Sequence, residues 1–534
     1  MASIVFNNVH FSYPAAATPV FEDLSLVLDT GWRTGVVGRN GRGKTTLLKL
    51  VSGELAAERG EVTGAAGGRR FPAPVADPRR ATRSVLKDAL GPFTAWERDM
   101  ADLLERGGEA ALTAYADLHE RYVARGGYRV DADLAREFDA LGLHESLLDR
   151  PFATLSGGEQ TRALIATLFL DPDGYPLIDE PTNHLDAAGR DRLMSYLAGR
   201  RGFLLVSHDR HFLDGSVDHV LSLNRSDVRI NRGNFTQWRT HADEVLAHEA
   251  RTRQRIERDV ARLESAARDT RRNAASREGD KYRTGALDKG FIGARAARQM
   301  RRARSVERRI ESELAERRGL LGNAEKSRRL DIGTRSRAGG APLLSAGGVT
   351  LSGGGRVLLR RLDLEIRAGE RVALTGPNGC GKTRLLDALC GTAQVDAGLI
   401  RRRPGVTIAR GHQHPLWRRG LLRERLRDAG LEETRFRQLL GVVGVGADAF
   451  DRDLSTFSAG QLKKVDLCRC LATPADLLIC DEPLNYVDLY SREQIEQAML
   501  EDGPTVLFVE HDRRFVDAVA TRVLDLTARA FTAR

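Results

Sequence analysis

Apolar and polar positions follow the same order in the two halves of the chain. An apolar run typical of a buried strand (33–37 and 371–375) precedes a glycine-rich turn and then a helix-like segment (46–50 and 384–388). Farther along each half, two more apolar runs end in acidic residues and in a histidine. This repetition predicts an α/β fold with two similar domains, which suits a chain of 534 residues better than one core would.

The pattern changes between the halves. Two stretches carry apolar residues at helical spacing among charged residues. The apolar residues of the first stretch are Ile256, Val260 and Leu263, and those of the second are Val306, Ile310 and Leu314. Glycines at 279, 285, 290 and 293 separate them. We therefore expect an antiparallel helical hairpin with a tip at 273–293 that reaches roughly 50 Å. A dimerising coiled coil is the alternative, although three apolar positions per helix are few for it.

The excess positive charge is concentrated in this central region. Residues 271–310 hold 13 Lys plus Arg against 4 Asp plus Glu, whereas the whole chain has a net charge of +10. The alternative is a solvated helix face, but such a face usually mixes signs. One-signed helices are typical of contact with a phosphate backbone, so we expect a nucleic-acid partner.

Apolar run lengths, the first residues and the cysteine spacing indicate the cellular compartment. No apolar run approaches the roughly 18 to 20 residues that cross a bilayer, and the first residues lack the pattern of a signal peptide. The five cysteines fit neither a disulfide framework nor zinc spacing, so we expect reduced thiols. These features predict a cytoplasmic protein without a membrane domain.

Each half contains one phosphate-binding loop of the G-x-x-x-x-G-K-[ST] pattern, and the two loops start 338 residues apart. Backbone N–H groups of such a loop cradle phosphates, the lysine reaches the outer phosphates and the hydroxyl ligates Mg²⁺. The first set of ATP-binding candidates is Gly38, Asn40, Gly41, Gly43, Lys44, Thr45 and Thr46, and the second is Gly376, Asn378, Gly379, Gly381, Lys382 and Thr383.

Three further elements follow each loop in the same order. A serine with small residues opens a helix-like run, which offers free N–H groups to an anion, at Ser156, Gly157 and Gly158 and at Ser458, Ala459 and Gly460. An Asp-Glu pair closes an apolar strand 23 residues after each serine, and the pairs are Asp179 with Glu180 and Asp481 with Glu482. The aspartate can hold Mg²⁺ and the glutamate can polarise the attacking water. His208 and His511 end the next strand and are candidate phosphate sensors.

This order of motifs resembles the ATP-binding cassette family over nearly the whole chain. The resemblance implies that the two cassettes pair within one monomer and that each signature serine faces the phosphate loop of the other half. Site one would combine Lys44, Thr45, Asp179, Glu180 and His208 with Ser458 and Gly460. Site two would combine Lys382, Thr383, Asp481, Glu482 and His511 with Ser156 and Gly158, and Gln413 resembles the glutamine that helps to hold Mg²⁺. Both sites would be ATPases.

Three departures from the family pattern concern single positions. Tyr13 stands where the family stacks an aromatic ring on adenine, whereas 351–353 has no aromatic residue, and residues 61–90 contain no counterpart of Gln413. Pro176 also interrupts the strand that leads to Asp179, and proline removes a ladder donor. We expect a weaker adenine contact in site two and slower chemistry in site one.

Within the family, the chain resembles the ABC-F subfamily, whose twin cassettes act on the ribosome. The domains would be a first cassette (1–225) with a helical arm at 94–132, a hairpin linker (226–340) and a second cassette (341–534). Wording such as Asp179-Glu-Pro-Thr-Asn-His-Leu-Asp186 carries this resemblance, and the 288–304 tract resembles its antibiotic-resistance group.

The resistance-group resemblance implies that the linker enters the E site of the 70S ribosome, contacts 23S rRNA and P-site tRNA, and dislodges a drug near the peptidyl transferase centre. Candidate RNA contacts are Tyr282, Arg283, Leu287, Lys289, Phe291, Arg295, Arg298, Arg301 and Arg302. Leu287 and Ile292 could equally close the hairpin turn. The alternatives are a housekeeping ABC-F translation factor, the ATPase subunit of a drug exporter and a DNA-directed cassette protein.

Overall fold

The computed structural model describes residues 3–14, 18–64, 68–171, 174–183, 185–224, 228–245 and 340–527, and the single residues 247, 248, 251, 258, 265, 305, 330 and 332. The chain forms two compact units, Met1–Phe235 with Arg328–Arg534, and Thr236–Ser327. The predicted hairpin tip at 273–293 and all nine candidate RNA contacts lie outside the described residues.

The first half of the chain is built on a six-stranded sheet in the order β5-β6-β7-β3-β8-β9. Its neighbours are parallel except for the last pair, which is antiparallel. The strands are β3 (Arg33–Val37), β5 (Gly68–Phe71), β6 (Tyr175–Asp179), β7 (Phe203–Val206), β8 (His219–Leu223) and β9 (Val228–Arg232). An antiparallel sheet of β2 (Phe21–Asp29), β1 (Ser3–Phe11) and β4 (Arg59–Thr63) completes this half.

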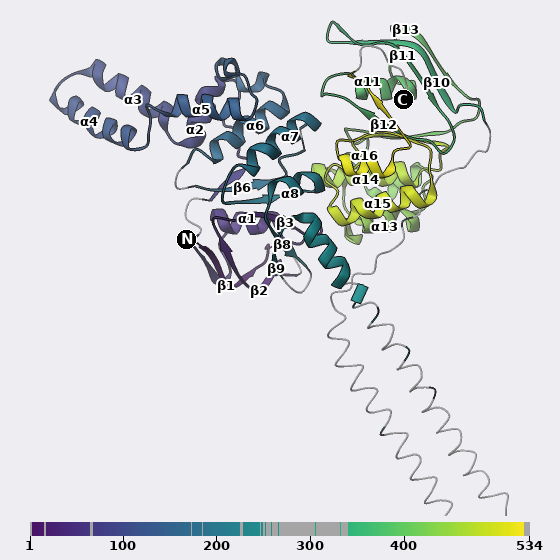
Figure 1. Ribbon diagram of the computed structural model, residues 1–534, viewed down its shortest axis with the longest axis horizontal. Helices are drawn as coiled ribbons and strands as arrows, with labels where there is room; N and C mark the ends of the chain where they lie inside the picture. The colour runs from purple at the N-terminus through teal and green to yellow at the C-terminus, as the bar shows by residue number, and fades with distance from the viewer. Residues whose placement is uncertain are drawn as a thin grey trace, which may run out of the picture. The chain divides into compact units, whose positions relative to one another are not determined.

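The second half repeats this plan (Figure 1). Its parallel sheet has the order β14-β15-β16-β12-β17, and its antiparallel sheet has the order β11-β10-β13. The strands are β10 (Leu344–Gly353), β11 (Arg356–Ile366), β12 (Arg371–Thr375), β13 (Ala397–Arg402), β14 (Ile408–Gly411), β15 (Leu477–Asp481), β16 (Val506–Val509) and β17 (Arg522–Asp525).

The helices of the first half are α1 (Lys44–Ser52), α2 (Thr82–Leu90), α3 (Phe93–Arg106), α4 (Glu109–Ala124), α5 (Val130–Ala140), α6 (Gly157–Leu168), α7 (Ala187–Ala198) and α8 (Arg210–Ser216). Those of the second half are α11 (Lys382–Cys390), α12 (Leu422–Asp428), α13 (Glu433–Val442), α14 (Ala459–Ala472), α15 (Leu489–Asp502) and α16 (Arg513–Val519). Short 3-10 turns, Glu145–Asp149, Phe152–Thr154, Ala447–Asp451 and Leu454–Thr456, lead toward α6 and α14. Within the described residues, no helix has the length and apolar character needed to span a membrane.

The helix after each phosphate loop is fixed by an apolar core on both sides. Leu47 and Leu48 of α1 are completely buried in one cluster with residues of β1 and β2 and of the parallel strands β6 and β7. Leu385 and Leu386 of α11 occupy the same place in the second half. Because both sheets pack on these helices, the glycine-rich turns at their N-termini are held in place.

Described helices and strands fall in the predicted arm region and near the predicted domain ends. The helices α3 and α4 form a hairpin in the predicted arm region, and Gly107 and Gly108 make its turn (Figure 1). Strand β9 belongs to the first sheet, so this sheet extends past residue 225. Leu330 and Ile332, in the predicted linker, are buried in the core of the second half.

Pro176 is compatible with its strand. It is the second residue of β6 and lies opposite Arg69 of β5, whereas pairing with β7 begins one residue later at Leu177. The missing N–H therefore falls at the start of the strand, where proline is tolerated.

Two glycines in the turn between α7 and β7 allow the backbone conformation of the first half to be tested. Gly202 has φ +68°, and a Cβ there would lie 2.0 Å from the Thr30 carbonyl oxygen. We expect Gly202→Ala to destabilise the first half by about 1–3 kcal/mol, because both strain and overlap oppose it. Gly199→Ala is the control, since φ is −83° and the nearest atom is 3.6 Å away. Equal denaturation midpoints for the two variants would contradict this account.

Candidate active sites

The two phosphate loops have the same local structure. Gly43 and Gly381 adopt positive φ (87° and 101°) immediately before their helices, where an L side chain would be strained. A Cβ on Gly43 would lie 2.6 Å from the Val20 side chain. These positions therefore require glycine for both conformation and space.

The loop lysines are folded back onto the loops that they follow. The Lys44 ammonium donates to the carbonyls of Gly38 at 2.7 Å and Arg39 at 3.1 Å. Lys382 donates in the same way to Gly376 at 2.7 Å and Pro377 at 2.9 Å. Burial lowers the pKa of Lys44, although the carboxylates of Asp488, Glu180 and Asp179 oppose this shift. Both amines lie where they can turn toward a bound phosphate.

The aspartates that end β6 and β15 lie next to the loop threonines. Thr45 Oγ1 donates to Asp179 Oδ2 at 2.9 Å. Asp481 is 1% exposed, and neither of its carboxylate oxygens accepts a hydrogen bond, although the Arg410 guanidinium lies 3.7 Å away. Burial raises the pKa of both aspartates above its ordinary value, and nearby Thr383 opposes this shift for Asp481. A buried carboxylate without a donor fits a divalent cation.

The glutamates that follow these aspartates are held in a rare backbone conformation. Glu180 has φ +51° and Glu482 has φ +49°. Their N–H groups donate to the carbonyls of Val206 at 2.9 Å and Val509 at 3.0 Å, which are in the neighbouring strands. Non-glycine residues in this region are strained, and such strain is concentrated at functional sites.

A histidine faces each glutamate. His208 Nε2 lies 3.4 Å from Glu180 Oε1, and His511 Nε2 lies 3.5 Å from Glu482 Oε1. Burial, and after it the charges of Lys44, Arg492 and Lys464, holds the pKa of His208 well below its ordinary value. His208 is therefore neutral at pH 7.

The two glutamates differ in their electrostatic surroundings. Burial and then the charge of Asp179 raise the pKa of Glu180 to about 8. Burial also acts to raise the pKa of Glu482, but a hydrogen bond to His511 and the charges of His511 and Lys463 outweigh it, so this pKa lies below its ordinary value. At pH 7, Glu482 is ionised and Glu180 is largely protonated.

Site two is a cavity of about 660 Å³ that residues from both halves line. The first half contributes Ser156 and the start of α6, which we call the signature helix of this half as α14 is of the other, and the second half contributes its phosphate loop, its Asp-Glu pair and its histidine. The predicted residues along its wall are Ser156, Gly157, Gly158, Asn378, Gly379, Gly381, Lys382, Thr383, Gln413, Ala459, Asp481, Glu482 and His511. The structure therefore brings together the two halves of this predicted site.

The signature serines are helix caps in both halves. Ser156 Oγ accepts from Glu159 N at 3.3 Å, and Ser458 Oγ accepts from Gln461 N at 3.2 Å. Each forms a capping box with the side chain three residues on. The caps leave the first N–H groups of α6 and α14 directed outward from the helix.

Contacts from the second half also reach the phosphate loop of site one. The Asn40 N–H donates to Asp488 Oδ2 at 3.2 Å, and Asn40 Nδ2 donates to the Tyr486 carbonyl at 3.2 Å. The Arg39 guanidinium lies 5.6 Å from the centre of the Tyr490 ring. Lys464, six residues after Ser458, is close enough for its charge to affect His208.

The departures noted in the sequence have structural counterparts. Tyr13 is 38% exposed, and its hydroxyl is 3.1 Å from Thr46 Oγ1. In site two, Leu358 of β11 is one of the apolar side chains on the cavity wall. Phe71 pairs with Ile178 as Gly411 pairs with Cys480, so Ala73 takes the place of Gln413 in the first half.

Sequence reasoning missed several residues that line the cavity. Lys463 donates to the carbonyls of His412 at 2.6 Å and Asp481 at 2.8 Å, and thereby ties α14 to two strand ends. The others are Asn183, Leu358, Arg384, His414, Pro415, Asn485 and Tyr486. The sequence carries one signal for Lys463, a charged residue on the apolar face of a helix. The other residues have no such signal, because their place in the cavity depends on how the two halves pack together.

Comparisons with known proteins agree with this architecture. The ABC transporter family profile matches residues 21–183 and 359–485, together more than half of the chain. The tylosin resistance ATP-binding protein TlrC of Streptomyces fradiae is 32% identical over 93% of this chain and 92% of its own length. The energy-dependent translational throttle protein EttA of Escherichia coli K12 is 28% identical over 95% and 89%. ABC transporter F family member 5 of Arabidopsis thaliana is 26% identical over 98% and 75%.

Solved structures show the same fold. The archaeal ribosome recycling factor aABCE1, in complex with a ribosomal stalk protein, has a TM-score of 0.57 at 21% identity over 97% of this chain and 87% of that chain. The RNase-L inhibitor has a TM-score of 0.55 at 20% identity over the same shares. The predicted α/β fold with two cassettes is confirmed, and these cassettes indicate ATPase activity. The chain belongs to the ATP-binding cassette family and, within it, to the ABC-F subfamily.

Proposed function

We propose that this protein is a ribosome-directed ATPase that binds two ATP molecules between its halves and uses their hydrolysis to release a ribosome that it has engaged. The observation that carries the proposal is the composite cavity of site two. Ser156 of the first half and Lys382 of the second line the same 660 Å³ space. A nucleotide there would touch both halves, so its binding and loss would control their docking.

The roles of the site residues follow from their geometry. Lys44 and Lys382 bind the outer phosphates, and the N-termini of the opposite signature helices complete the phosphate shell. Glu180 and Glu482 orient the attacking water, and the facing His208 and His511 sense the terminal phosphate. The rigid backbone of each glutamate keeps its carboxylate fixed while the phosphate is transferred.

The residues present fit Mg²⁺ bound together with ATP. In the described part of the chain, no group of three or more His, Cys, Asp or Glu could hold a metal ion by itself. Magnesium in such enzymes takes one or two protein oxygens and several from phosphates and water. Thr45 and Asp179 would supply these oxygens in site one, and Thr383, Asp481 and Gln413 would do so in site two. The ion would neutralise phosphate charge.

The proposed partner is the 70S ribosome in the cytoplasm. TlrC and EttA bear names that refer to antibiotic resistance and to translation, and each aligns with more than nine-tenths of this chain. The structural neighbours include ABCE1 bound to a ribosome, with a TM-score of 0.55. The basic segment 271–310 has the charge that rRNA and tRNA contact requires. Entry of the linker into the E site toward P-site tRNA would dislodge a bound drug.

A second candidate is a housekeeping translation factor, which the similarity to EttA favours. Translation in vitro distinguishes the two. If the protein protects ribosomes, adding it should restore synthesis that a drug near the peptidyl transferase centre has inhibited. A translation factor would instead change the rate of synthesis equally with and without the drug.

Removing both catalytic carboxylates should trap the protein on ribosomes. Glu180→Gln with Glu482→Gln keeps the shape of both side chains, so we expect ATP binding to persist while turnover falls by at least about 100-fold. The double variant should co-sediment with ribosomes in ATP-containing sucrose gradients, whereas Lys44→Ala with Lys382→Ala should not. Sedimentation equal to that of the unaltered protein would contradict the proposed cycle.

Shortening the linker tip should separate the two activities. Deletion of 275–291 leaves both cassettes untouched, so ATP turnover should stay within about twofold. Protection in drug-inhibited translation should be lost, because the tip would no longer reach the P-site tRNA. Full protection by the deletion variant would exclude the linker as the acting element.

The two sites should respond differently to pH. Because the pKa of Glu180 is about 8, the ionised fraction at site one rises with pH. Turnover by Glu482→Gln, which retains site one, should therefore increase about tenfold from pH 7 to pH 9. Turnover by Glu180→Gln should vary by less than about twofold, since the pKa of Glu482 is lowered. A flat profile for both single variants would contradict the assigned charge states.

A further inference from the structure

The helices α7 and α15, which follow the Asp-Glu pairs, make parallel sets of contacts in the two halves. Each starts at an aspartate whose Oδ1 caps the helix, Asp186 on Gly189 N at 2.8 Å and Asp488 on Ser491 N at 2.9 Å. The Oδ2 atom of each aspartate accepts from the phosphate loop of the opposite half. These N–H donors are Asn378 at 3.5 Å and Asn40 at 3.2 Å.

The first turn of each helix then holds the switch segment of its own half, meaning the histidine and the two residues after it. Arg190, four residues after the capping aspartate, pairs with Asp209 at 2.9 Å. Arg492, at the matching place in α15, pairs with Asp512 at 3.3 Å. Asp209 and Asp512 directly follow His208 and His511, and both are buried.

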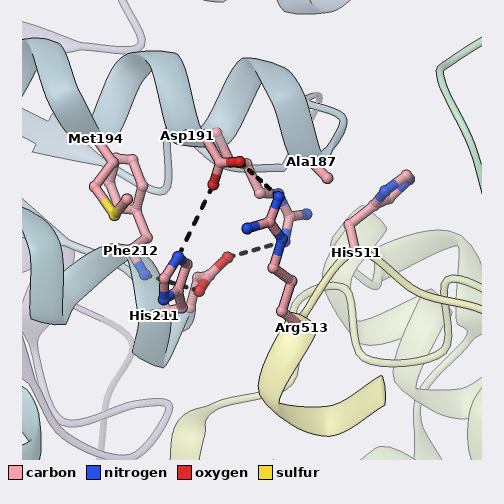
Figure 2. Close-up of a pocket in the computed structure, with 9 residues that line it drawn as sticks. Ala187, Asp191, Met194, His211, Phe212, His511 and Arg513 are labelled. Carbon is pink, nitrogen blue, oxygen red and sulfur yellow. Dashed lines mark hydrogen bonds and ion pairs between the residues drawn. The ribbon is translucent and has the colours of Figure 1, made fainter. Parts of the chain in front are cut away.

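The same helices also hold the switch segment of the opposite half. Asp191 of α7 accepts from Arg513 at 2.6 Å, and Glu496 of α15 accepts from Arg210 at 2.6 Å. Arg210 and Arg513 both stand two residues after their switch histidine. Figure 2 shows Arg513 directed at Asp191, with His511 beside it and His211 on the other side of the carboxylate.

We propose that Arg210 and Arg513 are positioning residues that couple the two ATP sites through α7 and α15. Because one helix is tied to its own switch segment and to the opposite one, displacement of either histidine moves the support of the other. Turnover at one site then depends on the docked state of both. This inference rests on the two composite sites proposed above.

The arginine contacts differ in burial, which determines the best variant for a test. The Arg210 and Glu496 side chains are 10% and 19% exposed, so loss of this pair risks unfolding. Those of Arg513 and Asp191 are 54% and 37% exposed, and such a pair contributes little to stability. Arg513→Gln is therefore expected to fold, and an unchanged melting temperature would verify this.

A second ion pair across the same boundary provides a matched control. Arg514 of α16 pairs with Asp214 of α8, and neither residue lies on α7 or α15. If the arginines only helped the halves to dock, Arg513→Gln and Arg514→Gln would have the same effect. Both variants would then raise the ATP concentration needed for half-maximal turnover.

ATP turnover by the full-length chain distinguishes these cases. We expect Arg513→Gln to lower kcat roughly tenfold with little change in KM, and Arg513→Lys to recover most of the loss. Asp191→Asn combined with Arg513→Gln should be no worse than either alone, because both remove one contact. Arg514→Gln should keep kcat within about twofold.

Two results would overturn the inference. One is a kcat for Arg513→Gln equal to that for Arg514→Gln, and the other is additive losses for Asp191→Asn and Arg513→Gln. Failure of the composite sites themselves would be recognised separately, since Ser156→Arg with Ser458→Arg, which alters the part of each site that the opposite half contributes, would then retain full ATP turnover. The coupling inference can therefore fail while the proposed sites stand.

Discussion

The two sites depend on how one pair of carboxylates is shared. Asp186 and Asp488 each use one oxygen to cap a helix of their own half and the other to accept from the phosphate loop of the opposite half. Each aspartate therefore fixes the start of its helix relative to the phosphate loop of the opposite half. If either moved, the hydrogen bond between the aspartate and the loop would break. Through this constraint, each phosphate loop meets a surface of the other half, and a nucleotide can be enclosed between them.

Much of each site could be predicted from the sequence because local rules determine it. Strand, glycine turn and helix have recognisable patterns, and parallel strands bring Asp179 and Thr45 to one edge of a sheet. The contacts between the first and second halves follow no sequence pattern of this kind. The pairing of Arg210 with Glu496 joins residues 286 positions apart, and no periodicity marks either one. The sequence also suggested that Pro176 disturbs β6, but Pro176 lies at the start of this strand, and pairing with β7 begins only after it.

The two sites are related by their backbone but not by their chemistry. Leu358 lines site two, whereas the aromatic Tyr13 lies beside Thr46 of site one, and Gln413 corresponds to Ala73. Lys463 in α14 aligns with Thr161 in α6, so a buried ammonium ties α14 to the Asp481 carbonyl where α6 has a threonine. Burial acts to raise the pKa of both glutamates and the charge of Asp179 adds to it at Glu180, whereas the hydrogen bond and charge of His511 and the charge of Lys463 lower the pKa of Glu482. Duplication has preserved the framework while the sites have diverged.

The left-handed backbone at Glu180 and Glu482 lowers the stability of the fold, yet the side chains at these positions are needed for ATP turnover. Glycine would occupy these positions without strain, and its introduction would relax the junction between strand and loop by about 1 kcal/mol. It would also delete the carboxylate that the reaction uses. Selection for fold stability alone would therefore favour glycine at these positions. The resulting protein would be more stable and would bind ATP without hydrolysing it.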